Sequence, residues 1–364
     1  MTTLPDALRA PIALPGNRIP RFYRGGLELA RFRGESPAFD DGRPEDWVGS
    51  ATRAWTPPGR PSSEIGLSRV VVGERETTLE KILAEAPGSL AGAALVERAG
   101  PTLGVLVKLL DAGERLPVHC HPTRRDAAAV LGSQFGKTEA WIVLGTRHDA
   151  AASVWIGFRE RVHLDRLRDW IERQDTAAML DALVEHRVDA GDVLLVPAGT
   201  PHAIGSGVFL LELQEPTDFS IVAETAGYPI DTPDATLRLG WERAITFFET
   251  VPAASPFQQP DRLDRSTERL LGAAADPFFR ALRQRIDGRA RPPFEPGYAV
   301  GVVLGGSGSV GGGGNKLELS RGTTFALPAA AVKAAHLDGS DLELVWCLGP
   351  DPSALDGLPT GRPI

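Results

Sequence analysis

Short apolar runs separated by turn residues dominate the chain. They are rich in Val, Leu and Ile, and Gly, Pro, Asn or Asp bound most of them. Runs of this length and composition are typical of strands in an antiparallel sandwich or barrel. The pattern therefore predicts a mainly β protein. The runs are GVLVKLL, EAWIVLG, ASVWIGF, GDVLLVPAG, GVFLLELQE, YAVGVVLGG, LELSRG and LELVWCLG.

Helical spacing of apolar residues is confined to three stretches, residues 77–96, 160–186 and 261–287. In each, charged residues stand between the apolar ones, which predicts an amphipathic helix. The Pro-rich segment RARPPFEPG after the third stretch is the best linker candidate. The Gly-rich segment at 304–319 lacks both a following helix and a Lys-Ser/Thr ending, so we interpret it as a hairpin turn rather than a phosphate-binding loop.

Two histidines stand one residue apart in the segment PVHCHPTRRD. Because alternate residues of a strand face the same side, His119 and His121 project together while Cys120 faces the other way. Two neighbouring imidazoles are half of a metal site. The segments GERLPVHCH and GDVLLVPAGTPH, which ends at His202, resemble the two half-motifs of the cupin superfamily, whose small β-barrel carries a metal inside. We interpret His148, His163, His186 and His336 as ordinary histidines.

The order of the motifs HCHP, GKTE and PAGTPH is similar to that of the type I phosphomannose isomerases. The segments RFYRGG, PEDWVGSA and VKLLDA extend the resemblance over most of the chain. It implies two small β-barrels or jelly rolls, a bicupin, with a helical insertion and a second barrel without metal. It also implies Zn²⁺, with Mn²⁺, Fe²⁺ or Ni²⁺ as alternatives. The implied metal ligands are His119, His121, Glu139 and His202.

These features together predict how the chain divides. Residues 1–158 and 188–245 would form the metal-binding N-terminal barrel, with the helical insertion at 159–187 between them. Residues 246–297 would be a helical segment and linker, and residues 298–364 the metal-free C-terminal barrel.

The reaction implied by the resemblance is aldose–ketose isomerisation, which moves a proton between neighbouring carbons through an enediol. The catalyst must stabilise a developing oxyanion, which a divalent ion does as a Lewis acid. Lys137 is a candidate for proton transfer because it stands two residues before Glu139 on the same strand face. Glu45 and Asp218 are candidates by resemblance, and the sequence does not decide among the three.

Two departures from the family pattern concern the substrate. Pro117 stands where a serine that helps to hold phosphate is common, and Val222 stands where the catalytic arginine is expected. A hexose that is sulfonated, such as sulfoquinovose, or unphosphorylated would fit these losses. The predicted substrate-binding residues are Arg124, Arg125, Lys108 and Arg24, of which the adjacent arginines suit bidentate contact with an anion.

Composition narrows the alternatives. The 364 residues carry a formal net charge of -8, which argues against nucleic acid or an anionic membrane as partner and favours a small sugar. Two cysteines, no apparent signal peptide and no long apolar stretch indicate a cytoplasmic protein. A sugar-binding cupin without catalysis and an Fe²⁺-dependent cupin oxygenase remain as alternative functions, and the sequence leaves the oligomeric state open.

Overall fold

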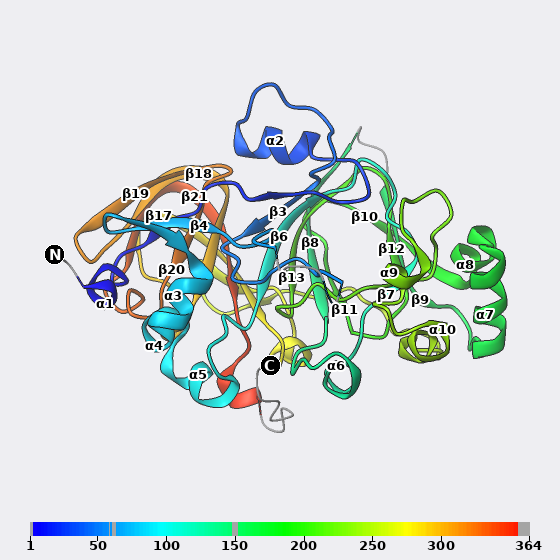
Figure 1. Ribbon diagram of the computed structural model, residues 1–364. Coiled ribbons are helices and arrows are strands. Elements are labelled where there is room, and N and C mark those ends of the chain that lie inside the picture. Colours follow the sequence, from blue (N-terminus) through cyan, green and yellow to red (C-terminus); the bar gives the residue numbers. More distant parts are fainter. Residues whose placement is uncertain (1–2, 58, 60–62, 148–151, 356–364) are drawn as a thin grey trace.

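Three antiparallel sheets stand side by side in the computed structural model, which describes residues 3–57, 59, 63–147 and 152–355. We call them the left, central and right sheets, after their places in Figure 1. A two-stranded ribbon lies near the left sheet. Mainly β architecture, as the apolar runs predict, is thereby confirmed.

Each sheet is assembled from strands that are distant in sequence, and the strands of each follow in spatial order. The left sheet contains β1 (Ile12–Ala13), β20 (Thr324–Leu327), β18 (Ala299–Gly312), β21 (His336–Leu348), β17 (Arg280–Ala290), β16 (Thr267–Arg269) and β15 (Asp261–Arg262), and β19 (Asn315–Ser320) pairs with β18. The central sheet contains β11 (Val193–Val196), β8 (Glu139–Thr146), β13 (Val208–Gln214), β6 (Leu106–Asp111), β3 (Glu45–Val48) and β2 (Arg18–Ile19). The right sheet contains β10 (Leu183–Val188), β9 (Ala152–Phe158), β12 (His202–Ile204), β7 (His119–Cys120) and β14 (Ile221–Val222). The ribbon pairs β4 (Arg69–Val72) with β5 (Arg75–Thr78).

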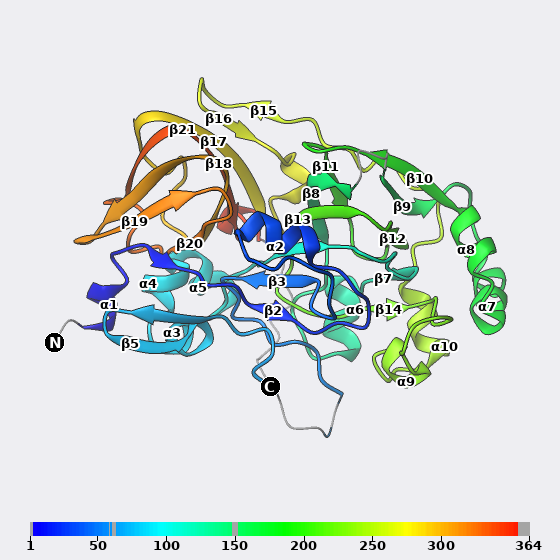
Figure 2. The ribbon, with the colours of Figure 1, turned by 90° about the horizontal axis from the view of Figure 1, so that it is seen from above.

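Short helices cover the edges and the outer face of the right sheet (Figures 1 and 2). The α-helices are α1 (Leu4–Ala7), α2 (Leu27–Arg33), α3 (Leu79–Glu85), α4 (Pro87–Ala91), α5 (Ala93–Ala99), α6 (Arg124–Val130), α7 (Leu164–Arg173), α8 (Thr176–Ala182), α9 (Thr232–Ala235) and α10 (Trp241–Ala244). Three 3₁₀ turns, η2 (Ile245–Phe247), η3 (Ala273–Ala275) and η4 (Pro352–Ala354), complete the described helical elements.

The central sheet is buried on both faces, and strand β6 illustrates why. Its residues alternate, so Val107 and Leu109 pack into the core shared with the left sheet, while Lys108 and Leu110 face the right sheet. Every residue of β6 is buried. Fully burying a Val or Leu side chain contributes about 1.5–3 kcal/mol. The space between the central and right sheets therefore has an apolar lining into which a few charged side chains project.

The predicted helices at 77–96 and 160–186 are confirmed, since α3 to α5 and α7 with α8 occupy these stretches. The Gly-rich segment forms the β18–β19 hairpin, and it turns at Gly313 and Gly314. Both have positive φ, 59° and 85°, which suits glycine in a two-residue hairpin turn.

The predicted helix at 261–287 is wrong, because this stretch forms β15, β16 and β17 around a 3₁₀ turn. Asp264 caps a tight turn by accepting hydrogen bonds from the backbone N–H groups of Ser266 and Thr267. Strand β17 then pairs along nearly its whole length with β21. Long-range pairing thus overrides the helical spacing. The division into domains stays a prediction, and the left sheet also recruits β1, β15, β16 and β17 from outside residues 298–364.

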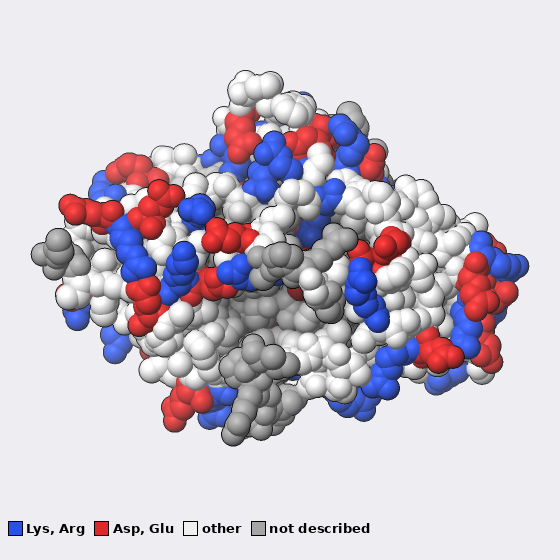
Figure 3. Space-filling view, in the orientation of Figure 1, with Lys and Arg blue, Asp and Glu red and all other residues white. Residues whose placement is uncertain are grey.

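The surface and helices carry few signs of a large partner. On the face seen in Figure 3, basic and acidic side chains are interspersed. Among the described residues, the structure contains no helix with the length and apolar character needed to span a membrane.

Candidate active site

The histidines of the two sequence motifs meet between the central and right sheets. His119 in β7 and His202 in β12 are directly paired across antiparallel strands, and their ring centroids are 4.1 Å apart. His121 follows β7 on the same side, whereas Cys120 points into the core beneath the helices of the right sheet. Potential ligand atoms of the three histidines all lie within 4.8 Å of one another. The alternation predicted for these residues therefore brings the imidazoles together.

Each of these imidazoles is oriented by a backbone carbonyl. The Nδ1 atoms of His119, His121 and His202 lie 2.8 Å from the carbonyl oxygens of Pro117, Phe219 and Thr200, respectively. A carbonyl can only accept, so Nδ1 carries the proton and Nε2 keeps its lone pair. Metal-bound histidines are held in this way. The buried Nε2 of His202 has no hydrogen-bond partner, so the three histidines fit a cation.

Burial keeps these imidazoles neutral. It lowers the pKa of His121 to about 3, with Lys137 adding to the shift. Burial also lowers the pKa values of His119 and His202. Metal binding requires unprotonated imidazoles, so no proton has to be removed from them near neutral pH.

Glu139, the first residue of β8, adds a carboxylate from the central sheet. Its Oε1 lies 3.0 Å from Nε2 of His121, and its Oε2 lies 3.7 Å from Nε2 of His202. Burial alone would raise its pKa, but Lys137 and His121 outweigh burial and hold the pKa well below its usual value. Three imidazoles and one carboxylate are therefore within reach of a single ion.

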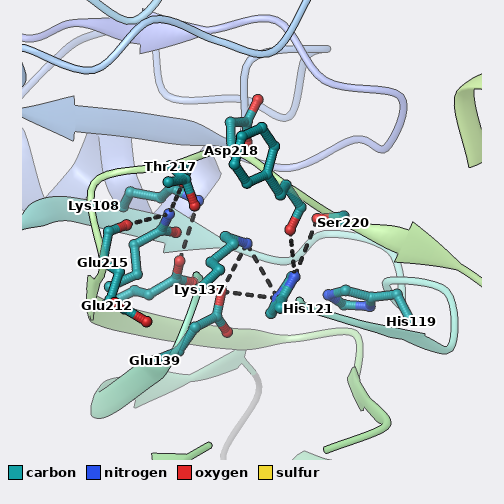
Figure 4. Close-up of polar contacts among 12 residues, drawn as sticks. Lys108, His119, His121, Lys137, Glu139, Glu212, Glu215, Thr217, Asp218 and Ser220 are labelled. Carbon is teal, nitrogen blue, oxygen red and sulfur yellow. Dashed lines mark hydrogen bonds and ion pairs between the residues drawn. The ribbon is translucent and has the colours of Figure 1, made fainter. Parts of the chain in front are cut away.

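Lys137 is the cation that contacts this donor set. Its Nζ lies 2.8 Å from Oε1 of Glu139 and 3.1 Å from Nε2 of His121 (Figure 4). The side chain is 5% exposed and faces the same side as Glu139, as the sequence predicts. The residues at this place thus already attract and neutralise a positive charge.

A second polar cluster extends from the donor set along the central sheet. Lys108 Nζ lies 3.1 Å from Glu212 Oε1 and 3.6 Å from Glu45 Oε2. Arg21 reaches the cluster from the N-terminal segment, with its Nε 3.0 Å from Glu45 Oε1. Its two terminal nitrogens donate to the carboxylate of Asp218 at 3.0 and 3.2 Å. Each cation of this cluster is thus paired with a carboxylate.

The environment sets the charge of these carboxylates in opposite directions. Burial, reinforced by Glu139, raises the pKa of Glu212 to about 7. Burial would also raise the pKa values of Glu45 and Asp218, but Arg21 outweighs it and lowers both. Glu45 and Asp218 are therefore ionised partners of Arg21 near neutral pH.

The segment that carries Arg21 is fixed by two glycines. A Cβ on Gly25 would lie 1.9 Å from the carbonyl oxygen of Asp111, and Gly26 has a φ of 106°. The Asp111 carboxylate accepts the N–H groups of Gly26 and Glu28 and binds Arg147. This anchor allows the preceding residues to cross the site.

A cavity of about 70 Å³, the inner pocket, lies beside the donor set. Polar groups from both sheets face it, and apolar side chains close the rest. Its lining includes Arg21, Phe22, Glu45, Lys108, Pro117, His119, Lys137, Glu139, Glu212, Asp218, Ser220 and Val222. The predicted proton-handling candidates Lys137, Glu45 and Asp218, and the predicted substrate ligand Lys108, are all among them.

Three predicted substrate-binding residues are not in this pocket. Arg24 is exposed and donates to the carbonyl oxygen of Asp40. Arg124 and Arg125 lie in helix α6, which a Thr123–Asp126 capping box starts immediately after the histidine motif. The helix turns both arginines away from the site, so this part of the sequence prediction is corrected.

Arg124 instead has a structural contact. Its Nε lies 2.5 Å from Oε1 of Glu215, a fully buried carboxylate, and its guanidinium lies 4.6 Å from the ring centroid of Phe278. We expect Arg124→Ala to lower the free energy of unfolding by about 3 kcal/mol, because it leaves a buried charge unpaired. Urea denaturation measures this. Exposed Arg125→Ala is the control and should change stability by less than about 0.5 kcal/mol. A raised Michaelis constant with unchanged stability in Arg124→Ala would restore the substrate role.

Sequence reasoning missed Arg21 and Glu212. Arg21 was visible in the segment RFYRGG, but nothing local links it to Asp218, which is 197 residues away. Glu212 lies in an apolar strand, GVFLLELQE, where one glutamate at an inward-facing position was the only signal.

The fold and the site define a cupin-like protein with a histidine and carboxylate cluster between two sheets, and relatives give it a family. No protein-family model matches the chain. A mannose-6-phosphate isomerase of Streptococcus mutans is 30% identical over 246 residues, 66% of this chain and 72% of that protein. A probable mannose-6-phosphate isomerase of Bacillus subtilis, GmuF, is 27% identical over 63% of this chain and 70% of its own length. The chain belongs to the mannose-6-phosphate isomerase family, and it is an aldose–ketose isomerase.

Solved structures agree in fold. The mannose 6-phosphate isomerase of Bacillus subtilis aligns with a TM-score of 0.71 and 21% identity, over 93% of this chain and 99% of that one. A variant of phosphomannose isomerase from Salmonella typhimurium aligns with a TM-score of 0.71 and 15% identity, over 94% of this chain and all of its own. A mannose 6-phosphate isomerase bound with zinc and yttrium aligns with a TM-score of 0.67, at 15% identity and over the same shares of the two chains.

Proposed function

We propose that the protein is a divalent-metal-dependent isomerase of a hexose, with His119, His121, Glu139 and His202 as the metal ligands. The observation that carries this proposal is the set of three imidazoles whose Nδ1 atoms are tied to carbonyls, leaving each Nε2 to face Glu139 and Lys137. Zn²⁺ suits this donor set, and Mn²⁺, Fe²⁺ or Ni²⁺ can use the same ligands.

The chain's own residues divide the remaining work. A divalent ion held by the four ligands supplies Lewis-acid stabilisation of the oxygen that becomes negative in the enediol reaction. Lys137 moves the proton between the two carbons, since it lines the inner pocket directly beside the ligands. Both carboxylate oxygens of Asp218 accept from Arg21, and Glu45 accepts from Tyr23 and Trp47. We therefore assign Asp218 and Glu45 to positioning.

The substrate is a hexose without a phosphate ester. The two relatives are named for mannose 6-phosphate, yet the pocket cations Arg21, Lys108 and Lys137 each already contact a carboxylate. Pro117 has no side-chain donor, and Val222 offers no charge. Of the sulfonated and unphosphorylated hexoses that the sequence suggests, this pairing favours the unphosphorylated ones.

A panel of sugars tests the proposal. The Zn²⁺-loaded protein is incubated with mannose, glucose and galactose, with their 6-phosphates and with sulfoquinovose, and ketose is followed by NMR. We expect ketose from at least one neutral hexose, and a kcat/KM for mannose 6-phosphate below about 10⁴ M⁻¹s⁻¹. Efficient turnover of mannose 6-phosphate would contradict the altered substrate. Binding of a sugar without ketose would favour the alternative of a sugar-binding protein, which the valine at 222 also suits.

A further inference from the structure

A second cavity opens outside the inner pocket. This outer pocket has a volume of about 410 Å³, and it shares part of its lining with the inner pocket. The shared residues are Arg21, Phe22, Asp218, Ser220 and Val222. The two cavities therefore form one path from the surface to the donor set.

The size of the inner pocket limits what it encloses. Its volume of about 70 Å³ corresponds to room for about five water molecules, at about 10–15 Å³ for each. A hexose has about twelve non-hydrogen atoms, so it exceeds this space. A sugar that brings its reacting carbons to Lys137 must therefore extend past Val222 and leave its far end in the outer pocket.

The outer pocket offers aromatic and acidic groups to that end. Phe22 is 37% exposed, and Trp55 is half-buried in the opposite part of the lining. Asp231 and Asp234 add two carboxylates. Among the described lining residues, the only cation is Arg21, which Asp218 already binds through two hydrogen bonds.

This lining discriminates between charges. One arginine against three aspartates gives a formal charge of −2, which repels a phosphate dianion in a confined cavity. Hydroxyl groups can instead donate to the free carboxylate oxygens. The apolar face of a sugar ring can also pack on an indole, which supplies a large and rigid contact surface.

We propose that the outer pocket is a subsite for the uncharged, hydroxyl-bearing end of the hexose, with Trp55 as its main contact surface. This inference rests on the proposed isomerase function and names the part of the substrate that decides specificity. Val222 belongs to the same design, because it lines both cavities where the sugar passes between them. An arginine at this position would bring a cation to the junction, whereas valine leaves the junction apolar.

Matched pairs of neutral hexose and hexose 6-phosphate test the subsite. For the neutral hexose turned over best, Trp55→Ala should raise KM about tenfold or more, leave kcat within about threefold and leave the Zn²⁺ content unchanged. Trp55→Phe should restore most of the loss. The control is Trp241→Ala, since Trp241 packs against the same core but lies outside both pockets, and it should keep the wild-type KM. Val222→Arg should raise kcat/KM for the 6-phosphate about tenfold or more relative to the neutral sugar.

The outcomes separate the subsite from the isomerase function. Turnover with a wild-type preference for the 6-phosphate, or an unchanged KM in Trp55→Ala, would overturn the subsite and leave the isomerase standing. If no sugar is turned over, calorimetry with the same pairs decides. Binding of the neutral sugar that is weakened by Trp55→Ala would support the subsite without catalysis, and equal or tighter binding of the 6-phosphate would overturn it.

Discussion

Replacing one of the three clustered histidines should abolish metal binding and turnover together. We expect wild-type protein to bind one equivalent of Zn²⁺, and His121→Ala and His202→Ala to bind none at stoichiometric concentration. The physical reason is that each variant removes one of four donors from a buried site whose remaining groups stay desolvated. Elemental analysis after dialysis measures the stoichiometry, and sugar turnover should fall by at least about a thousandfold, since removal of a major electrostatic stabiliser costs about 10²–10³ by itself.

A stability measurement provides an independent readout. Free Zn²⁺ at a hundred times its dissociation constant should stabilise the wild-type fold by about 2.7 kcal/mol, and should not stabilise the two variants. His186→Ala is the matched control, because His186 is a half-buried histidine of the right sheet that packs on Phe257 rather than on the cluster. Undiminished Zn²⁺ stoichiometry in both cluster variants, or an equal loss in His186→Ala, would refute the proposed ligand set.

The sequence predicts the histidine cluster well because local rules determine it. The spacing of His119 and His121 fixes a shared face, and the spacing from Lys137 to Glu139 does the same one strand away. Antiparallel pairing of β7 with β12 then sets His202 directly opposite His119. Only this last step needs the fold, and the family resemblance supplies it.

Elsewhere, neighbours in the sequence proved a poor guide to neighbours in space. Arg124 follows the histidines by three residues, yet the Thr123 cap starts a helix that turns it toward Glu215. Arg21 is remote in sequence, yet the crossing of the N-terminal segment brings it to Asp218. The strand β17 was missed for a related reason, because its partner β21 lies much further along the chain and decides its conformation.

Lys137 should be the second residue whose loss abolishes turnover, although by a different route from the histidines. We expect Lys137→Met to lower kcat by about 10²–10⁴, the usual contribution of a positioned proton-transfer group. KM for a neutral hexose should change little, because the far end of the sugar lies in the outer pocket. Steady-state kinetics with the Zn²⁺-loaded variant measures both constants.

Metal affinity distinguishes this role from a structural one. Lys137 contacts Glu139 and His121 and therefore competes with an incoming cation for the same atoms. Removing the competing charge should leave Zn²⁺ affinity equal to that of the wild type or tighter, so lost activity with retained metal assigns Lys137 to the chemistry. Partial rescue of Lys137→Ala by added methylamine would support the same assignment, since a small amine can re-enter the vacated space. Wild-type kcat in Lys137→Met would reject it, and weaker Zn²⁺ binding that accounts for the whole loss would make Lys137 a residue that merely maintains the donor set.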